Sequence, residues 1–311
     1  MMQAETGGAI TVRFALPSAA LRPYVTTYYR TTVTGHPSKP ALEDYLHPEW
    51  ANLRFMQAGW AQSAIGADPV QPAPAFCITG PTSKAARFRI GPGRSWGIGL
   101  LPLGWSALID APAGDYADRI VDGAQDRAFA AFHPLAAALG AALENANSDF
   151  AAELAIIEKH MEKMAANPSP LALRITAINA ALVDPEIATV TALAERVGMN
   201  VRSLERLSQR AFGFTPKLLL RRQRFLRSLS QFMLDPSLKW LRTLDCQYHD
   251  QAHFVRDFKR FMGMSPSAYA KLDKPFLIAA ARARMAIAGE AVQGLHDPGS
   301  IRARAKSDDP R

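Results

Sequence analysis

Cysteine is scarce in this chain, which has only two among 311 residues, Cys77 and Cys246. They fall in different predicted domains, and neither has a partner at metal-binding or redox spacing, so we expect free thiols. The chain also lacks an apolar run of membrane-spanning length, and residues 1–10 lack the basic start and apolar core of a signal peptide. These absences argue against a secreted scaffold or a membrane protein and predict a cytoplasmic location.

Residues that could carry metal or covalent chemistry are also few. His36 and His47 fall in predicted loops, and no His-x-His pair with a trailing Glu appears, so we expect no metal site and no cofactor. Cys77 lies between Phe76 and Ile78, an apolar setting without the cations that activate a thiolate. We therefore expect Cys77 to be a core residue and the chain to have no catalytic residues.

The length of the chain is sufficient for two domains with separate cores. Residues 8–110 are predicted to be β-rich, because short β-branched and aromatic segments alternate with Gly and Pro, a pattern typical of a barrel or sandwich. The predicted strands are 10–14, 24–29, 53–56, 75–78, 86–90 and 96–100. Helices are predicted at 135–146 and 150–164, and Asn167 to Pro170 is the best domain boundary.

A repeated unit organises the C-terminal part of the chain. The matched pairs, fifty positions apart, are Arg206 and Arg256, Arg210 and Arg260, Gly213 and Gly263, and Thr215-Pro216 and Ser265-Pro266. Each copy begins with a potential N-cap, Asn200 or Asp250, and ends with a glycine before a proline. A helix followed by a stop signal therefore occurs twice.

Each repeated helix is predicted to bury one face and to expose cations and amides on the other. The apolar faces are Leu204, Leu207 and Ala211 in the first helix and Phe254, Phe258 and Phe261 in the second. Residues 201–271 hold 14 Lys and Arg against 5 Asp and Glu, a net charge of +9, whereas the rest of the chain holds 22 against 23. The positive excess therefore lies on this unit, as expected of a surface that binds phosphates. A single helix of this kind could equally well be an ordinary helix with a solvent-exposed charged face. The presence of two such helices favours DNA binding.

The segment before the first repeated helix predicts a helix-turn-helix unit. Thr191 to Val197 has a helical pattern, and Gly198 then allows a tight turn into Val201, so that the second helix can enter a DNA major groove. In the second copy, the helix predicted at 238–245 is followed by a turn without glycine. The helix predicted at 217–234 would span about 27 Å at ~1.5 Å per residue. It could therefore hold the two repeated helices near the ~34 Å spacing of successive major grooves. Its predicted exposed residues are Arg221, Arg222, Arg224 and Arg227.

Residues 249–269, HDQAHFVRDFKRFMGMSPSAY, resemble the signature of AraC/XylS-type transcription regulators. The resemblance covers about residues 170–272, where the family has two helix-turn-helix units joined by a long helix. It departs from the family at Gln247, where Gly is usual, and at Arg242, in a stretch that is usually apolar; both departures concern the second turn. The β-rich part, with Gly80-Pro81-Thr82 and residues 97–104, resembles the cupin-like sensor domain of many members.

The resemblance implies an α+β chain with a cupin-like β-barrel before an all-α double helix-turn-helix domain. The expected domains are a sensor and dimerisation domain at 1–166, an AraC-type DNA-binding domain at 167–272, and an extension at 273–311. The extension is predicted to be helical at 276–288 and disordered at 302–311, and we assign it no role. Helices 135–146 and 150–164 either pair two subunits or pack on the barrel; we favour pairing.

The resulting interpretation is a sequence-specific regulator that reads two successive major grooves of double-stranded DNA. The predicted base-reading residues are Arg202, Glu205, Arg206 and Gln209 in one groove and Gln251, His253 and Arg256 in the next. The predicted phosphate contacts are Arg221, Arg222, Lys259 and Arg260. Other candidate partners are RNA polymerase, a small-molecule effector in the N-terminal domain and a second copy of the chain.

Two other interpretations have less support from the sequence. A small-molecule-binding or catalytic β-barrel with a vestigial DNA-binding domain is disfavoured by the intact Gly198 in the first turn. A purely architectural DNA binder is disfavoured because it would leave a sensor-sized domain without a role.

Overall fold

The N-terminal part of the chain is built from two antiparallel sheets. A computed structural model describes residues 10–35, 41–57, 61–145, 148–165, 170–234, 245, 248 and 250–296. The six-stranded sheet has the order β1-β2-β9-β4-β7-β10, and the four-stranded sheet has the order β3-β8-β5-β6. The strands are β1 Ile10–Ala15, β2 Val25–Val33, β3 Leu42–Leu46, β4 Asn52–Met56, β5 Ala61–Ile65, β6 Gln71–Pro72, β7 Phe76–Thr79, β8 Ala86–Ile90, β9 Gly93–Leu100 and β10 Ile120–Asp122. All six predicted strands are present, and β3, β5, β6 and β10 were not predicted.

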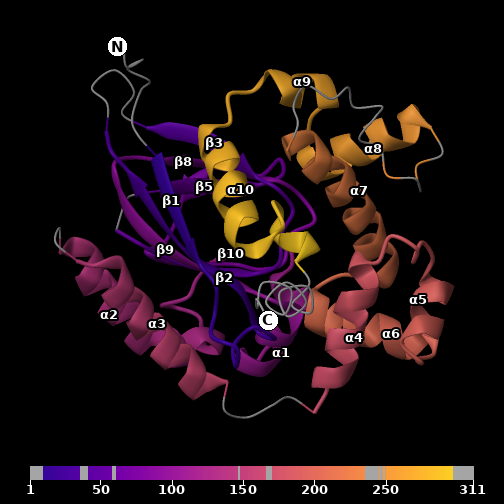
Figure 1. Cartoon of the computed structure of the whole chain (residues 1–311), viewed down its shortest axis with the longest axis horizontal. Helices are drawn as coiled ribbons and strands as arrows, with labels where there is room; N and C mark the ends of the chain where they lie inside the picture. Colours follow the sequence, from indigo (N-terminus) through magenta and orange to yellow (C-terminus); the bar gives the residue numbers. More distant parts are fainter. Residues whose placement is uncertain are drawn as a thin grey trace, which may run out of the picture.

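The expected β-rich domain before a helical domain is confirmed, but the sheets do not close into a barrel, because no strand pairing among the described residues joins them. A helix from the far end of the chain, α10 (Pro275–Ala288), lies instead across the edge where β1 and β3 face each other (Figure 1). The backbone N–H of Leu277 donates to Asp44 Oδ2 at 3.0 Å, and the Phe276 ring packs edge-on against Phe88, with 5.1 Å between centroids. A helix thus covers an edge that a barrel would close with strand hydrogen bonds.

Helices α2 (His133–Glu144) and α3 (Phe150–Met164) lie along the outer face of the six-stranded sheet (Figure 1). Their apolar faces are buried, with Leu139 and Ile157 fully inaccessible. Trp96 Nε1 donates to Glu153 Oε2 at 2.6 Å, and Arg30 forms an ion pair with the same oxygen at 3.0 Å. The two helices therefore pack on the sheet, and their pairing of two subunits stays a prediction. Between β9 and α2 lie α1 (Pro102–Leu108), η1 (Ala113–Tyr116) and η2 (Arg127–Phe132).

The C-terminal part is helical, as expected. It contains α4 Ala172–Val183, α5 Val190–Arg196, α6 Val201–Phe212, α7 Pro216–Leu234, α8 Gln251–Met262, α9 Pro266–Lys271, α10 and η4 Gln293–Leu295. The helices predicted at 191–197, 217–234 and 276–288 are each confirmed to within one residue. Most of the helix predicted at 238–245, Asn167 to Ser169 of the predicted boundary, and the predicted disorder at 302–311 fall outside the described residues.

The helical part packs firmly against the sheets. One helical core joins Leu204 and Phe212 to Trp50 and Leu101 of the β-rich part, and a second joins α7, α8 and α9 to Ala85. The Trp50 and Phe212 rings meet edge-on at 5.7 Å. Both repeated helices, α6 and α8, thus contact the β-rich part, which gives changes in the sheets a physical route to these helices. The division into 1–166, 167–272 and 273–311 stays a prediction.

Candidate nucleic-acid interface and effector cavity

The two repeated helices, α6 and α8, are capped in the same way. Asn200 Oδ1 accepts from the Ser203 N–H at 2.8 Å, and Asp250 Oδ1 accepts from the His253 N–H at 2.6 Å. Both helices end at a left-handed glycine, Gly213 with φ of 83° and Gly263 with φ of 72°. The predicted repeat is therefore confirmed at its caps and stops.

The first helix-turn-helix unit is also confirmed. The turn between α5 and α6 contains Gly198 with φ of 63°, and the Met199 N–H returns to the Ala194 carbonyl at 2.9 Å. A Cβ at Gly198 would meet nothing within 4 Å, so the backbone conformation, and not crowding, favours glycine at this position.

The predicted base-reading residues of α6 lie together on its exposed face, opposite the buried Leu204 and Leu207; they are Arg202, Glu205, Arg206 and Gln209. Gln209 also meets the β-rich part, because a Cβ at Gly114 in η1 would lie only 2.8 Å from its Nε2. The same Nε2 donates to the Gly213 carbonyl at 3.3 Å. All four residues are therefore exposed, and Gln209 also lies next to η1.

On α8, Gln251 and Arg256 are exposed, and His253 is half-buried. His253 Nε2 lies 3.1 Å from Arg224 Nη2, and its ring packs edge-on against Tyr248 at 5.2 Å. Burial lowers the pKa of His253, and Arg224 lowers it further, so the imidazole is neutral at physiological pH. Because Arg224 can only donate, Nε2 accepts, which assigns the ring proton to Nδ1.

The predicted phosphate residues fall into two groups. Lys259 and Arg260 are exposed on the last turn of α8. The predicted exposure of Arg222 is wrong, because its side chain is fully buried between α7 and the β-rich part. Its Nη1 donates to the Thr82 carbonyl at 3.0 Å and to the Glu49 carbonyl at 3.4 Å, and burial lowers its pKa to about 9. A phosphate contact would require Arg222 to leave this site.

The other arginines of α7 form ion pairs: Arg224 and Arg227 are largely buried, contrary to the prediction, whereas Arg221 keeps about a third of its side chain exposed. Arg221 Nε donates to Asp257 Oδ1 at 2.5 Å, and Arg224 Nη2 lies 3.2 Å from Asp257 Oδ2. Tyr248 donates its hydroxyl to the same carboxylate at 3.0 Å. Arg227 pairs with Asp245 at 2.5 Å. Sequence reasoning missed Asp257, although its position three residues after Phe254 places a carboxylate on the apolar stripe of α8.

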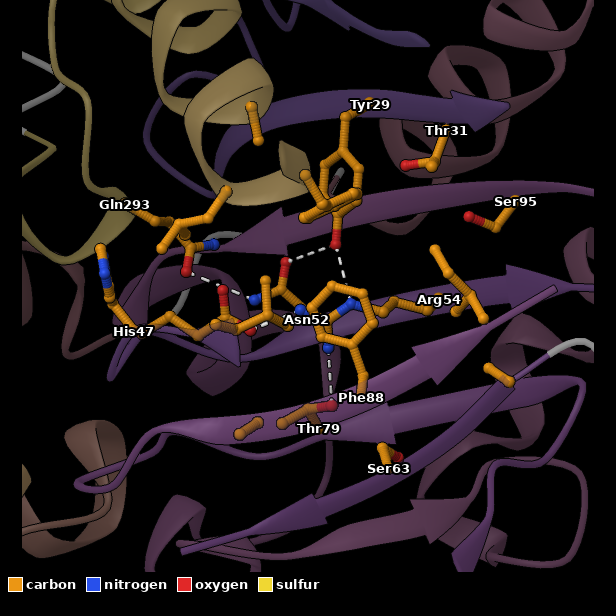
Figure 2. Close-up of a pocket in the computed structure, with 18 of the residues that line it drawn as sticks. Tyr29, Thr31, His47, Asn52, Arg54, Ser63, Thr79, Phe88, Ser95 and Gln293 are labelled. Carbon is orange, nitrogen blue, oxygen red and sulfur yellow. Dashed lines mark hydrogen bonds and ion pairs between the residues drawn. The ribbon is translucent and has the colours of Figure 1, made fainter. Parts of the chain in front are cut away.

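A cavity of about 150 Å³ lies between the two sheets. A hydrogen-bonded network crosses it (Figure 2). Arg54 donates to the Tyr29 hydroxyl at 2.9 Å and to Thr79 Oγ1 at 2.7 Å, and it also pairs with the Glu49 carboxylate. Tyr29 donates to Asn52 Oδ1 at 3.2 Å, and Asn52 Nδ2 donates to Gln293 Oε1 at 3.3 Å. The network thus connects the six-stranded sheet to η4.

One wall of the cavity comes from the C-terminal extension, to which the sequence assigned no role. Phe276, Ala280 and Arg284 of α10 and Gln293 of η4 line it. The pattern of 276–288 predicted a helix, but no local signal indicates that this helix returns to β1 and β3. The opposite walls are apolar, with Met56, Ala61, Phe88 and Ile90. The extension therefore forms part of the cavity wall.

Cys77 also lines the cavity and is buried. Burial raises its pKa to about 11, so it is a neutral thiol at physiological pH. Across the described part of the chain, no group of three or more His, Cys, Asp or Glu could hold a metal ion. None of the described helices combines the length and apolar character needed to span a bilayer.

Comparison with known proteins gives one family match. Residues 193–272, from α5 to the end of α9, match the helix-turn-helix domain family. No curated protein matches the chain significantly. Solved structures of ToxT from Vibrio cholerae are similar to it: one has a TM-score of 0.42 at 10% identity and covers 85% of this chain and 98% of its own. Another, with unsaturated fatty acid bound, has a TM-score of 0.39 at 12% identity and covers 87% and 97%. At these TM-scores the likeness supports no conclusion about this chain.

The matched family covers the first helix-turn-helix unit, the connecting helix and the second repeated helix, which is the region with the doubled cap, stop and cationic face. Residues 193–272 therefore form an AraC-type helix-turn-helix domain, the DNA-binding part of a transcription regulator.

Proposed function

We propose that the protein reads two successive major grooves through α6 and α8 and that a small molecule in the cavity between the sheets sets this activity. The observation that carries the proposal is the pair of equally capped, cation-bearing helices joined by α7, a helix of 19 residues. Such a pair suits a site of about two helical turns on one face of DNA.

The exposed side chains divide into two proposed roles. Arg202, Arg206 and Arg256 suit guanine, because a guanidinium can donate to both O6 and N7. Gln209 and Gln251 suit adenine, Glu205 can accept from cytosine N4, and His253 can donate from Nδ1. Lys259 and Arg260 are proposed to contact phosphates and so to add affinity without sequence preference. Arg221 keeps about a third of its side chain exposed and can add a phosphate contact beside its ion pair.

Effector control is supported by a continuous set of contacts from the cavity to the DNA-binding helices. Arg54 in the cavity pairs with Glu49, whose carbonyl accepts from Arg222 on α7. In a second contact, the N–H of Ala85, directly before Ala86 of the cavity wall, donates to the Phe261 carbonyl at the end of α8 at 2.6 Å. A ligand that moves Arg54 would therefore bias the position of α7, which sets the spacing of α6 and α8.

Further proposals rest on the AraC-type assignment. RNA polymerase is a proposed partner, the cytoplasm is the proposed location, and a second copy of the chain is proposed to pair through the outer face of α3, where Ile156 is 39% exposed. The alternative, a catalytic barrel with a vestigial DNA-binding domain, has less support, since both caps, Gly198 and the exposed face of α6 are intact and Cys77 is a buried thiol.

Selection from a random duplex library, followed by fluorescence anisotropy, tests the proposed function. We expect the selected site to bind at least about 10³-fold more tightly than a scrambled duplex at physiological salt. Equal affinity for the two duplexes would remove sequence-specific reading.

A further inference from the structure

The cavity holds one buried cation without an anionic partner, Arg284 on α10. Only 5% of Arg284 is exposed, and its side chain lines the cavity. Its Nη2 donates to Thr27 Oγ1 at 2.8 Å and to Thr26 Oγ1 at 3.3 Å, whereas its Nη1 has no hydrogen-bond partner. Among the described residues no carboxylate lies within ion-pair distance of it. A buried charge without a partner is costly, so its presence in a cavity needs an explanation.

The other cation of the cavity differs in this respect. Arg54 uses its three nitrogens on Tyr29, Thr79 and Glu49, so its charge and its donors are matched within the protein. Glu49 and Glu290 influence Arg284 only from a distance, and burial lowers its pKa to about 10, which leaves it charged at neutral pH. Arg284 is thus the cavity group with an unused donor and an unneutralised charge.

The other side chains that line the cavity determine the size and the apolar character of a ligand that would fit. Its apolar side chains, Met56, Ala61 and Ile90, belong to one buried cluster, and Phe14 and Phe88 add aromatic surface. Arg284 itself lies over Phe14, with 5.5 Å from its guanidinium carbon to the ring centroid. An apolar cavity of about 150 Å³ accommodates a molecule of roughly benzene size. The remaining surface is mostly apolar, and its polar side chains Arg54, Asn52 and Gln293 are already bonded within the protein, so the cavity matches a small amphipathic anion.

We propose that the cavity binds a small monocarboxylate with an apolar body, and that Arg284 is the residue that pairs with its carboxylate. This inference rests on the proposed effector role of the cavity. A planar guanidinium and a carboxylate form strong, directed hydrogen bonds, and the bond from Nη1 supplies the partner that the protein does not. Since Arg284 lies on the C-terminal extension, the ligand would also fasten α10 to the sheets.

Calorimetric titration of the full chain at pH 7 with phenylacetate and hexanoate, and with their neutral amides, tests the proposal. We expect each acid to bind about 10- to 100-fold more tightly than its amide. We expect Arg284→Met to remove this preference, because the acid loses its partner while the amide does not. Arg282→Met is the matched control, since Arg282 is exposed two residues earlier on the same helix and should change neither affinity.

Five results would overturn the proposal in whole or in part. The first is a wild-type protein that binds acid and amide equally, and the second is an Arg284→Met variant that keeps the preference for the acid. If Arg284→Met does not fold, Arg284→Lys can be used, because it retains a cation and should keep the preference for the acid. An Arg284→Lys variant that binds acid and amide with equal affinity would contradict the proposal. If only the amides bind, the claim that Arg284 pairs with a carboxylate is wrong, but the cavity can still bind an effector. If no probe binds up to 10 mM, roughly the range of weak fragments, the proposed effector role of the cavity is wrong as well.

Discussion

The Arg222 guanidinium on α7 lies over the indole ring of Trp50, with its central carbon 3.9 Å from the ring centroid. Trp50 belongs to the β-rich part, directly after Glu49, and α7 connects the two repeated helices. A side chain that sequence alone would assign to DNA phosphates therefore holds the sensor and the DNA-binding helices together. This changes what its substitution should do.

We expect Arg222→Met to leave the salt dependence of DNA binding unchanged, because the buried guanidinium releases no counterions. Arg260→Ala should reduce the slope of log K against log salt by about 0.9, as expected for one lost phosphate contact. Anisotropy titrations at several salt concentrations measure both slopes. A decrease for Arg222→Met as large as that for Arg260→Ala would place Arg222 on DNA after all.

Arg206→Ala should cost roughly 1–3 kcal/mol of binding free energy and relax the preference at one base position, because it removes a donor pair for a guanine edge. The measurement is a set of single-base substitutions across the selected site. Arg174→Ala on α4 removes an equally exposed cation away from α6 and should leave the base profile intact. An unchanged profile for Arg206→Ala would shift the reading of bases to α8.

Local patterns predicted much of this structure, and the misses share one physical cause. The caps at Asn200 and Asp250 and the stops at Gly213 and Gly263 depend on neighbours in sequence, and the structure has them where expected. The arginines of α7 were misplaced because their partners, Trp50 and Asp257, are far away in the chain. The same holds for Arg284, whose position in the cavity depends on where α10 packs.

Asp257→Ala should lower the free energy of unfolding by about 3 kcal/mol, because it leaves Arg221 and Arg224 without their shared carboxylate. Chemical denaturation measures this, with Asp273→Ala, an exposed carboxylate, as the control. We expect the loss of stability to be largest at the contact between α7 and α8, so the rate of amide hydrogen exchange should rise first in these two helices. A decrease in the free energy of unfolding of no more than about 0.5 kcal/mol, the usual range for surface substitutions, would show that the ion pairs of Asp257 do not stabilise the α7–α8 contact.

Asp44 should make the docking of α10 pH-dependent. Burial raises the pKa of Asp44 from 3.8 to about 6, although the Leu277 N–H bonds its carboxylate. Because the folded pKa is the higher one, its contribution is fully present below pH 4 and is lost as the pH rises through about 6. The loss is at most about 3 kcal/mol.

Asp44→Asn keeps an acceptor for Leu277 but cannot ionise. The difference in unfolding free energy between wild type and Asp44→Asn should therefore change between about pH 4 and pH 6 and be constant above about pH 7. Denaturation curves at intervals of pH measure this difference. A difference that is constant throughout would show that Asp44 titrates in the folded protein as it does in the unfolded chain.

The most direct test of two-groove reading is the spacing of the two half-sites in the selected duplex. If α6 and α8 are held by α7, five added base pairs between the half-sites turn one of them to the opposite face of DNA. We predict that anisotropy shows affinity falling to that of a scrambled duplex. Unchanged affinity after the insertion, at the same salt, would contradict a rigid pair of helices that reads successive major grooves.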